Sequence, residues 1–317
     1  MAPLREGFQT VTIGGRDDEL QATFVPDAGM VCCSLRHRGR ELLAQRDGVR
    51  AYAERGKTMG IPLLYPWANR LAGFGYPTAS GDVRLSPDDA LLMRDEHGLP
   101  IHGVLPGALP WELDEGDSGG DRLRARLRWR PPELLAIFPF EHELELSASV
   151  AGATLLIETR VRACAREAVP VSFGFHPYLS PFDSDRRGWE IELPVSRRLA
   201  LDERMIPTGA SEPFDRRRFV LGDGAWDDAF AGVTEPPVFK VSAAGGGACG
   251  ATARAIELEL RHGFPYAQLY APAGEDFVCF EPMTAPTDAL RSGQGPPPVT
   301  AGELFSSAFA IVVRSGS

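Results

Sequence analysis

Hydrophobic and polar residues alternate with a period of two along much of the chain. In residues 122–130 (RLRARLRWR), four apolar side chains alternate with five arginines. This pattern is typical of an antiparallel strand with one buried and one solvated face. The same alternation recurs in residues 143–149, 154–162, 189–194 and 256–261, and further extended segments begin near residues 21, 266, 276 and 305. The pattern therefore predicts strands over the whole length of the chain.

Signals for helices are few. Residues 86–93 (SPDDALLM) combine an N-cap serine, a proline at the first helical position and two acids, which predicts a helix of about two turns. No strand alternates with a long helical pattern, and no GxxxxGK[ST] phosphate loop occurs, so nucleotide enzymes are disfavoured. We expect an all-β fold, with one antiparallel sandwich forming a single domain over residues 1–317.

Composition and charge narrow the classes of partner. The 34 glycines and 27 prolines fit many turns between strands, and the net charge of −10 disfavours nucleic acid and anionic membranes. No apolar run approaches the roughly 18 residues of a membrane span. The scattered cysteines form neither a disulfide framework nor a zinc pattern, so we expect reduced, mostly buried thiols in a cytoplasmic protein that binds a small molecule. They are Cys32, Cys33, Cys164, Cys249 and Cys279.

Two of the six histidines lie in settings that suit chemistry. His176 follows the apolar residues 171–175 and precedes a proline, so a strand end would hold its imidazole as a proton donor or acceptor. His102 lies in the loop GLPIHGVLPG, which has room to approach a ligand closely. His37, placed between arginines in an expected turn, is predicted to be exposed to solvent.

Other polar residues follow apolar segments. Asn69 and Arg70 come directly after IPLLYPWA, and an amide and a guanidinium suit the binding of hydroxyls or the fixing of a carboxylate. Glu281 follows the apolar residues 277–280 and precedes a proline. We expect its carboxylate at a strand end and partly desolvated, which would raise its pKa toward that of a useful base.

Together these residues belong to a recognisable set of motifs. They are YPWANR from Tyr65, IHG from Ile101, FGFHPY from Phe173, WDDAF from Trp226 and CFEPMTAPTDAL from Cys279. In order and approximate spacing the set resembles the aldose 1-epimerase (galactose mutarotase) family over about residues 10–313. The most specific feature is HPY, followed after about 50 residues by an Asp-aromatic motif and after about 50 more by the glutamate.

The resemblance implies a galactose mutarotase-like β-supersandwich, in agreement with the strand pattern. It also implies that His176 is the general acid and Glu281 the general base. The C1 hydroxyl of a sugar would lose a proton while its ring oxygen gains one, so that the C1–O5 bond opens and recloses to the other anomer. Each group would contribute about 10²–10⁴-fold to the rate, and both should titrate not far from neutral pH. No metal or other cofactor is required.

Further residues are implied in substrate binding. Arg70, His102 and Asp227 match residues that hold the sugar hydroxyls and orient the catalytic pair, and Asn69 is suited to hydroxyls. Asp228 leaves a one-residue ambiguity, but alignment on the aromatic residue of WDDAF selects Asp227. Aromatic side chains near the motifs are candidates for stacking on a sugar face. They are Trp67, Tyr178, Trp226 and Phe280.

We therefore expect an isomerase of carbohydrate metabolism that acts on a hexose such as glucose or galactose, as a monomer or homodimer. The segment after Glu281 departs from the Thr-Gln-Asn-Phe-Pro-Asp-Ala pattern frequent in the family, which leaves the preferred sugar open. One alternative is a 1-epimerase for a hexose 6-phosphate, but relatives of that kind follow His-Gly with Phe-Ala-Arg, whereas this chain has Val104-Leu105-Pro106. A related alternative, a 1-epimerase for an acidic sugar, needs a cationic pocket. Another is a carbohydrate-binding module without turnover, which would predict the loss of His176 or Glu281, and both are present.

Overall fold

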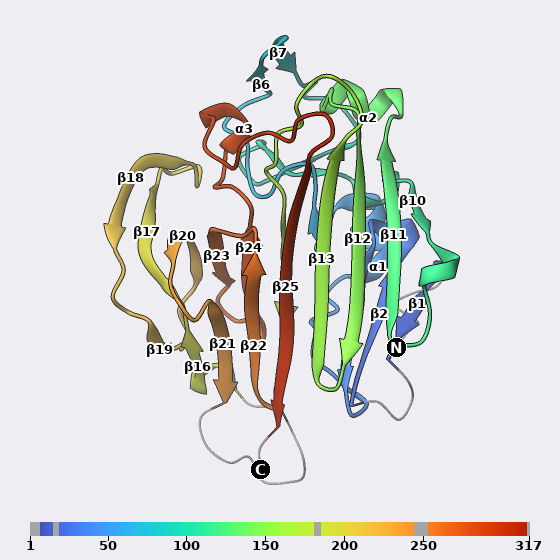
Figure 1. The fold of residues 1–317 in the computed structure, drawn as a ribbon. Helices are drawn as coiled ribbons and strands as arrows, with labels where there is room; N and C mark the ends of the chain where they lie inside the picture. Colours follow the sequence, from blue (N-terminus) through green and yellow to red (C-terminus); the bar gives the residue numbers. More distant parts are fainter. Residues whose placement is uncertain (1–6, 15–18, 181–184, 244–252, 316–317) are drawn as a thin grey trace.

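The computed structural model describes residues 7–14, 19–180, 185–243 and 253–315. Within these residues, a large antiparallel sheet of nine strands forms one layer of the molecule (Figure 1). In spatial order its strands are β10 (Trp111–Leu113), β11 (Arg122–Trp129), β12 (His142–Ala151), β13 (Thr154–Ala163), β25 (Leu304–Ser315), β22 (Ala253–His262), β21 (Val238–Ala243), β16 (Trp189–Glu192) and β19 (Arg218–Val220).

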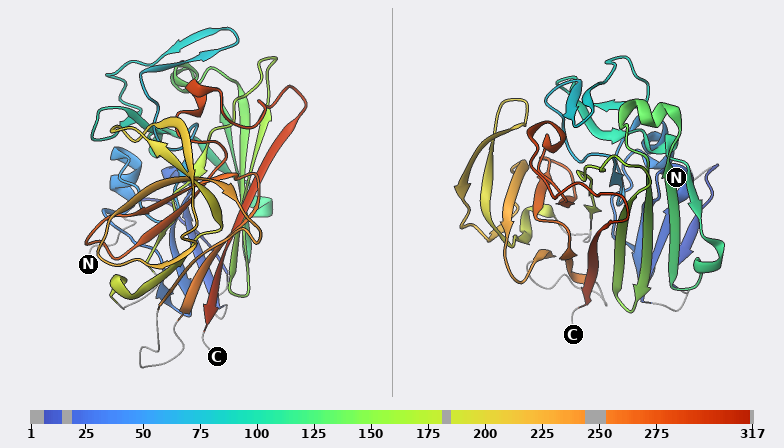
Figure 2. Two further views of the ribbon diagram at one scale, coloured as in Figure 1. Left: turned by 90° about the vertical axis from the view of Figure 1, so that its left-hand side faces the viewer. Right: turned by 45° about the horizontal axis from the view of Figure 1, so that its top comes forward.

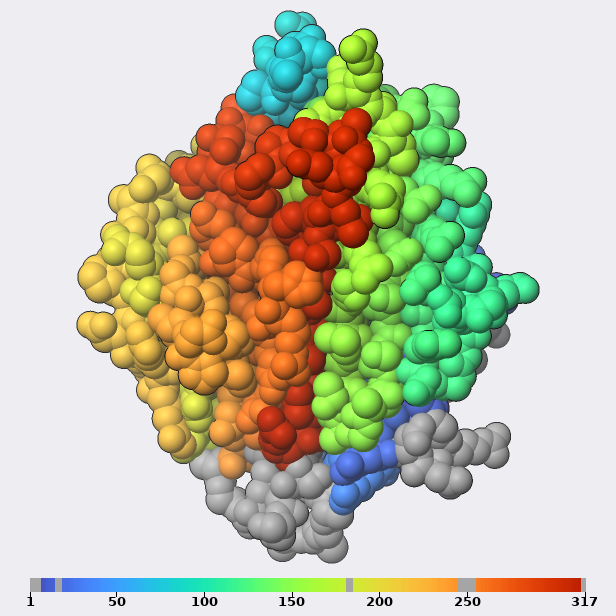
Figure 3. Space-filling view, viewed as in Figure 1, coloured from blue at the N-terminus to red at the C-terminus, as the bar shows by residue number. Residues whose placement is uncertain are grey.

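The alternation seen in the sequence produces this sheet. In β11, Leu123, Ala125, Leu127 and Trp129 are buried, and the arginines between them face solvent or form ion pairs with acids such as Glu145. The predicted strands at 143–149, 154–162, 189–194 and 256–261 are confirmed as β12, β13, β16 and β22. Strand β25 pairs with β13 on one side and β22 on the other, and in the space-filling view it runs in red between the green and orange strands (Figure 3).

Two smaller sheets pack against the large one (Figure 2). The eight-stranded sheet of the described residues contains β18 (Pro207–Pro213), β17 (Val195–Leu201), β20 (Trp226–Val233), β23 (Tyr266–Ala271), β24 (Val278–Met283), β14 (Gly174–Phe175) and β5 (Leu63–Leu64) in that order, with β15 (Tyr178–Leu179) also paired to β24. The four-stranded sheet contains β1 (Val11–Ile13), β2 (Leu20–Val25), β3 (Val31–His37) and β4 (Arg40–Glu41). Isolated bridges such as Cys32 to Ile61 join these two sheets.

The core between the layers is rich in aromatic side chains. Phe175 of the eight-stranded sheet lies 5.0 Å from Phe309 of β25, measured between ring centroids, and Phe280 of β24 lies 5.7 Å from Phe239 of β21. Such pairs contribute about 0.5–1.5 kcal/mol each beyond the burial of their area. The all-β supersandwich expected from the sequence is confirmed.

Helices are short and lie outside the sheets. They are α1 (Gly48–Arg55), α2 (Pro132–Ile137) and α3 (Ala289–Ser292), with 3₁₀ turns η1 (Pro26–Ala28), η2 (Pro106–Ala108), η3 (Glu115–Asp117) and η4 (Arg186–Gly188). None of these helices of the described chain is long and apolar enough to span a membrane. Two hairpins complete the structure, β6 (Gly75–Thr78) with β7 (Gly81–Arg84) and β8 (Leu92–Arg94) with β9 (Pro100–Val104).

The predicted helix at residues 86–93 is wrong. The Asp89 side chain accepts a hydrogen bond from the amide of Leu91 at 2.9 Å, and the Asp89 amide donates to the carbonyl of Ser86 at 3.1 Å. Ser and Asp cap turns as well as helices, since their side chains satisfy the backbone locally. Leu92 then pairs with Val104 of β9, so burial in a hairpin takes precedence over the helical signal.

Two further expectations are corrected or refined. His37 was expected in an exposed turn, but it is 3% exposed on β3, and its Nε2 lies 3.1 Å from the Glu19 carboxylate. The turn begins one residue later, at Arg38. The expected buried thiols are confirmed for three cysteines, whereas Cys164 is exposed and Cys249 lies outside the described residues; the three are Cys32, Cys33 and Cys279.

Candidate active site

A polar cavity of about 290 Å³ opens on the face of the eight-stranded sheet that points away from the core. Successive side chains of a strand point to opposite faces of the sheet, which explains why polar groups gather on this face. Phe280 of β24 packs on the large sheet, so its neighbour Glu281 points to the opposite face. Cross-strand pairing places Asp227 beside Tyr270 and Gln268 beside Glu281. The cavity is lined by Arg46, Gly56, Lys57, Thr58, Asn69, Arg70, Glu96, Ile101, His102, His176, Tyr178, Asp227, Tyr270 and Glu281.

His176 and Glu281 contact each other at the base of this cavity. The Nε2 atom of His176 lies 3.3 Å from Oε1 of Glu281 and 3.3 Å from the hydroxyl of Tyr178. Both side chains are nearly inaccessible to solvent, and neither Nδ1 of His176 nor Oε2 of Glu281 has a hydrogen-bond partner among the described residues. Glu281 does not end its strand as expected, because β24 continues to Met283.

Burial changes the acidity of both groups. It raises the pKa of Glu281 well above the ordinary value, and the nearby Asp227 carboxylate adds to this effect. It lowers the pKa of His176 well below the ordinary value, with His102 and Arg46 adding to the shift. Desolvation therefore favours the uncharged form of each group. At 3.3 Å the two groups are close enough for the charge on one to affect the proton on the other.

The tyrosine next in the chain fixes the His176 ring. Tyr178 stacks on His176 with ring centroids 4.4 Å apart and planes 5° from parallel. Its hydroxyl lies 2.6 Å from Oγ1 of Thr58, which holds the phenol from the far side. The main chain contributes as well, since the His176 amide donates to the carbonyl of Pro62 at 3.1 Å.

A second group of residues surrounds a buried guanidinium. Nε of Arg70 lies 2.5 Å from Oδ2 of Asp95, and Nη2 lies 3.2 Å from Oε1 of Glu96. The Asn69 amide oxygen accepts hydrogen bonds from both the backbone N–H and Nη1 of Arg70. These contacts hold the guanidinium in one orientation in the cavity wall.

His102 is fixed by the same segment. Its Nδ1 accepts a hydrogen bond from the backbone N–H of Asn69 at 3.2 Å, so the proton of the neutral ring is on Nε2. Burial, reinforced by the Arg70 charge, lowers the pKa of His102 to about 3, and the ring remains neutral at ordinary pH. Gly103 is required beside it, because its φ is +77° and a Cβ would lie 2.0 Å from the carbonyl oxygen of Tyr65.

The two adjacent aspartates of β20 have different environments. Asp227 lines the cavity, where its carboxylate accepts a hydrogen bond from Gln268 and burial raises its pKa. Asp228 does not line the cavity and forms an ion pair with Arg198 of β17. Of the two aspartates between which the sequence left an ambiguity, Asp227 is the one that lines the cavity.

The cavity includes residues that the sequence reading missed and omits others that it proposed. Of the four candidate aromatic side chains, only Tyr178 lines the cavity; Trp67 and Phe280 are core residues, and Trp226 stacks on Phe219. Tyr270 lines the cavity instead, and it lies in β23, in the extended segment that the sequence predicted near residue 266. Arg46, Lys57, Thr58 and Glu96 come from loops without any such signal.

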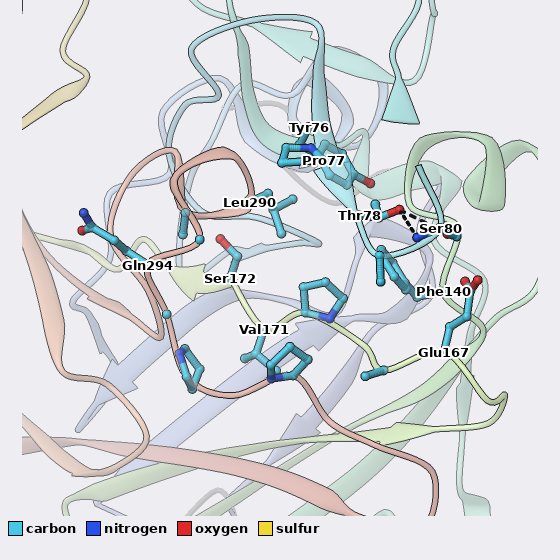
Figure 4. A pocket seen from close by; sticks show the side chains of 18 of the residues that line it. Tyr76, Pro77, Thr78, Ser80, Phe140, Glu167, Val171, Ser172, Leu290 and Gln294 are labelled. Atoms are coloured by element: carbon cyan, nitrogen blue, oxygen red, sulfur yellow. Dashed lines mark hydrogen bonds between the residues drawn. The ribbon is translucent and has the colours of Figure 1, made fainter. Parts of the chain in front are cut away.

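A larger cavity of about 580 Å³ lies elsewhere, between the β6–β7 hairpin and the segment around α3 (Figure 4). Its lining combines apolar side chains such as Phe140, Val171 and Leu290 with polar ones such as Thr78 and Glu167. It brings no imidazole to a carboxylate. Of the two cavities, the polar one is therefore the cavity that holds an imidazole and a carboxylate in contact, the pair suited to proton transfer.

Comparisons with known proteins bear on the fold and on the family of this chain. No curated protein sequence matches the chain. A protein of Synechocystis sp. PCC 6803 of known structure is 23% identical, with a TM-score of 0.76 and coverage of 100% and 99% of the two chains. The GalM/aldose epimerase homologue from C. elegans is 14% identical, with a TM-score of 0.75 and coverage of 98% and 100%.

A third structure, galactose 1-epimerase from Lactobacillus acidophilus NCFM, is 12% identical, with a TM-score of 0.71 and coverage of 98% and 100%. At such identities the structures establish the fold. The family itself is identified by the sequence, because the model of the family described as aldose 1-epimerase matches residues 18–311. With a mutarotase-like fold and a match across nearly its whole length, the chain belongs to the aldose 1-epimerase family of isomerases.

Proposed function

We propose that the chain interconverts the α and β anomers of a hexose such as glucose or galactose. The observation that carries this proposal is the contact of 3.3 Å between Nε2 of His176 and Oε1 of Glu281 in a polar cavity. Opening a hemiacetal requires one group to take the proton of the C1 hydroxyl and another to protonate the ring oxygen. A buried imidazole and carboxyl in contact provide both.

Glu281 is the base and His176 the acid in ring opening. Glu281 takes the proton from the hydroxyl on C1, the electron pair of that oxygen forms the aldehyde, and the C1–O5 bond breaks as His176 protonates O5. Rotation about C1–C2 presents the other face of the aldehyde. In ring closure His176 takes the proton from the O5 hydroxyl, and Glu281 returns one to the carbonyl oxygen. The enzyme thus regains its starting protonation state.

The remaining residues hold the sugar. Arg70 and the Nε2–H of His102 donate hydrogen bonds to hydroxyl oxygens, and the carboxylate of Asp227 accepts them. The side-chain oxygen of Asn69 is already bonded to Arg70, so its NH₂ group is the part that donates to a hydroxyl. Tyr178 stacks on His176 and presents the edge of its phenol to the ring of the sugar. Because Arg70 and His102 are fixed by partners within the protein, little side-chain entropy is lost when the sugar binds.

Exchange between anomers tests the proposal directly. The purified protein should accelerate the polarimetric equilibration of α-D-glucose or α-D-galactose, and Glu281→Gln and His176→Asn should each lower kcat by about 10²–10⁴-fold. Glu167→Gln is a matched control, since it removes a carboxylate from the other cavity. Normal rates in both site variants would contradict the assignment of roles. Sugar binding without any exchange would favour the alternative of a carbohydrate-binding module.

Three broader expectations accompany this proposal. A single domain over residues 1–317 predicts one cooperative unfolding transition, as followed by calorimetry. A monomer or homodimer predicts one of two masses in light scattering. A cytoplasmic location predicts recovery with the soluble cell fraction.

A further inference from the structure

We propose that the hexose carries an anionic substituent on C5, which Arg46 and Lys57 bind. This inference deepens the proposed function and depends on it. The substituent is a carboxylate, a sulfonate or a phosphate ester, which share an anionic cluster of oxygens able to accept hydrogen bonds from guanidinium and ammonium groups.

The first observation is a pair of cations that form no ion pair with a carboxylate. Arg46 and Lys57 flank helix α1 and both line the polar cavity. Neither forms an ion pair with a carboxylate of the described chain, whereas Arg70 in the same cavity is bound by Asp95 and Glu96. The charge of Arg70 is therefore compensated inside the protein. The exposed Glu275 acts on Arg46 only at longer range, so the charges of Arg46 and Lys57 are available to a ligand.

The second observation is that Arg46 is placed by aromatic rings. Its guanidinium carbon lies 5.1 Å from the ring centroid of Tyr178 and 5.3 Å from that of Phe277. Cation–π contacts of this kind orient a guanidinium while leaving its N–H groups, at the edge of the plane, free to donate. The phenol of Tyr178 in turn stacks on His176. A continuous row of planar groups thus joins Arg46 to the proposed acid.

The reaction itself indicates which part of the sugar faces this row. His176 protonates the ring oxygen, and that oxygen is bonded directly to C5. The substituent on C5 is therefore on the side of His176, toward Tyr178 and Arg46, while Arg70 and the acids around it face other positions of the ring. An acidic group on C5 meets the two available cations; a hydroxymethyl group would leave them without partners.

The charge of the whole chain strengthens the argument. With 43 acidic against 33 basic residues, the surface is not generally positive, so a pair of uncompensated cations at a cavity is a local feature. Electrostatic complementarity at a cleft contributes to substrate choice and to the rate of encounter. The acidic-sugar alternative raised by the sequence is the one that this cavity wall favours.

NMR saturation transfer between anomers at equilibrium tests the inference, because it needs no anomerically pure sugar. The substrates are glucose, galactose, glucuronate, galacturonate, a hexose 6-sulfonate and glucose 6-phosphate. We expect the wild-type kcat/KM to be higher for at least one acidic sugar than for its neutral counterpart. The best of the three acidic groups identifies the substituent. The KM of that substrate should also rise with ionic strength, as screening weakens its contact with the cations.

Variants then assign the preference to the two cations. Arg46→Met and Lys57→Met should each lower the ratio of acidic to neutral kcat/KM by roughly tenfold, mainly through KM, since each removes a charged hydrogen bond. Arg46→Lys should retain part of the preference. Arg128→Met is the matched control, because it removes an exposed positive charge on β11 and should not change the ratio.

The outcomes separate this inference from the proposed function. Exchange of neutral sugars at equal or higher kcat/KM than every acidic sugar overturns the inference and leaves the proposed function standing. An equal effect of Arg46→Met on both classes also overturns it, because the residue would then serve only to support Tyr178. Absence of exchange with all six sugars overturns the proposed function, and the inference with it.

Discussion

Replacing Asp95 by Asn should destabilise the protein by leaving a guanidinium buried without its main counterion. The Asp95 side chain is 1% exposed, and its Oδ2 atom lies 2.5 Å from Nε of Arg70. Its other oxygen accepts backbone hydrogen bonds from His97 and Leu99 at 2.9 and 2.8 Å. Asparagine keeps that acceptor, but it turns an amide N–H toward the N–H of Arg70 and removes the negative charge.

The size of this loss in stability depends on how well Glu96, the second acid beside Arg70, still compensates the charge of the guanidinium. Removing one partner of a buried ion pair costs about 3–5 kcal/mol. Glu96 still contacts Arg70 at 3.2 Å, but its side chain is 67% exposed, so the expected loss is near the lower end, about 3 kcal/mol. Glu96→Gln removes the same charge from the same guanidinium and should cost at most about 1 kcal/mol, because that pair is screened by water.

Urea denaturation of the two variants, followed by tryptophan fluorescence, measures this difference. Both substitutions change the net charge by the same amount, so effects of overall charge cancel in the comparison. The free energy of unfolding should fall clearly more for Asp95→Asn, with unchanged m values. Equal losses in the two variants, or a loss below about 1 kcal/mol for Asp95→Asn, would refute the argument that burial of Asp95 determines its contribution.

Three other predictions concern the cavity and the segments around it. Because the folded-state pKa of Glu281 is raised, the folded protein binds this proton more tightly than the unfolded chain does. The stability that this group contributes is present below its ordinary pKa of 4.5 and is lost as pH rises through the folded-state pKa. Glu281→Gln should therefore be more stable than wild type at pH 8 in urea titrations. A pH-independent difference would contradict this. Tyr178→Phe keeps the stacked ring but removes the hydroxyl 3.3 Å from His176, and should lower kcat several-fold with a shifted pH profile; a change in KM alone would point to a binding role. Gly103→Ala should reduce the free energy of unfolding by several kcal/mol, since its Cβ would overlap the Tyr65 carbonyl, whereas Gly98→Ala, with φ +75° and no atom within 4 Å, should cost only about 1 kcal/mol. Similar losses at both glycines would show that φ alone matters.

The strands that could be predicted are those whose own residues alternate clearly between apolar and polar. In β11 the contrast between buried leucines and exposed arginines is repeated at every second residue, so the strand is recognisable without its neighbours. The two-residue strand β14 has no room for such a pattern, and its pairing with Met283 and Leu64 depends on distant segments. The false helix at residues 86–93 has the same origin, because the partner of Leu92 is in β9.

The site divides in the same way. His176 and Glu281 could be proposed because each follows an apolar run, and the motifs gave them a context; their contact of 3.3 Å could not be read from residues about a hundred positions apart. Arg46 and Lys57 reach the cavity from loops on either side of α1, a helix that the sequence did not predict. Residues placed by tertiary packing alone leave no periodic trace in the sequence.

The hydrogen bond from the main chain of Asn69 to His102 has a consequence for engineering this site. The donor that fixes the His102 tautomer is a backbone amide, so an exchange of the side chain at position 69 for any residue but proline leaves the donor in place. Directed changes of hydroxyl preference at Asn69 can therefore be made without turning His102 from a donor into an acceptor. The position of the backbone therefore determines that His102 donates a hydrogen bond into the cavity. Reversing this would require a change in the conformation of the loop.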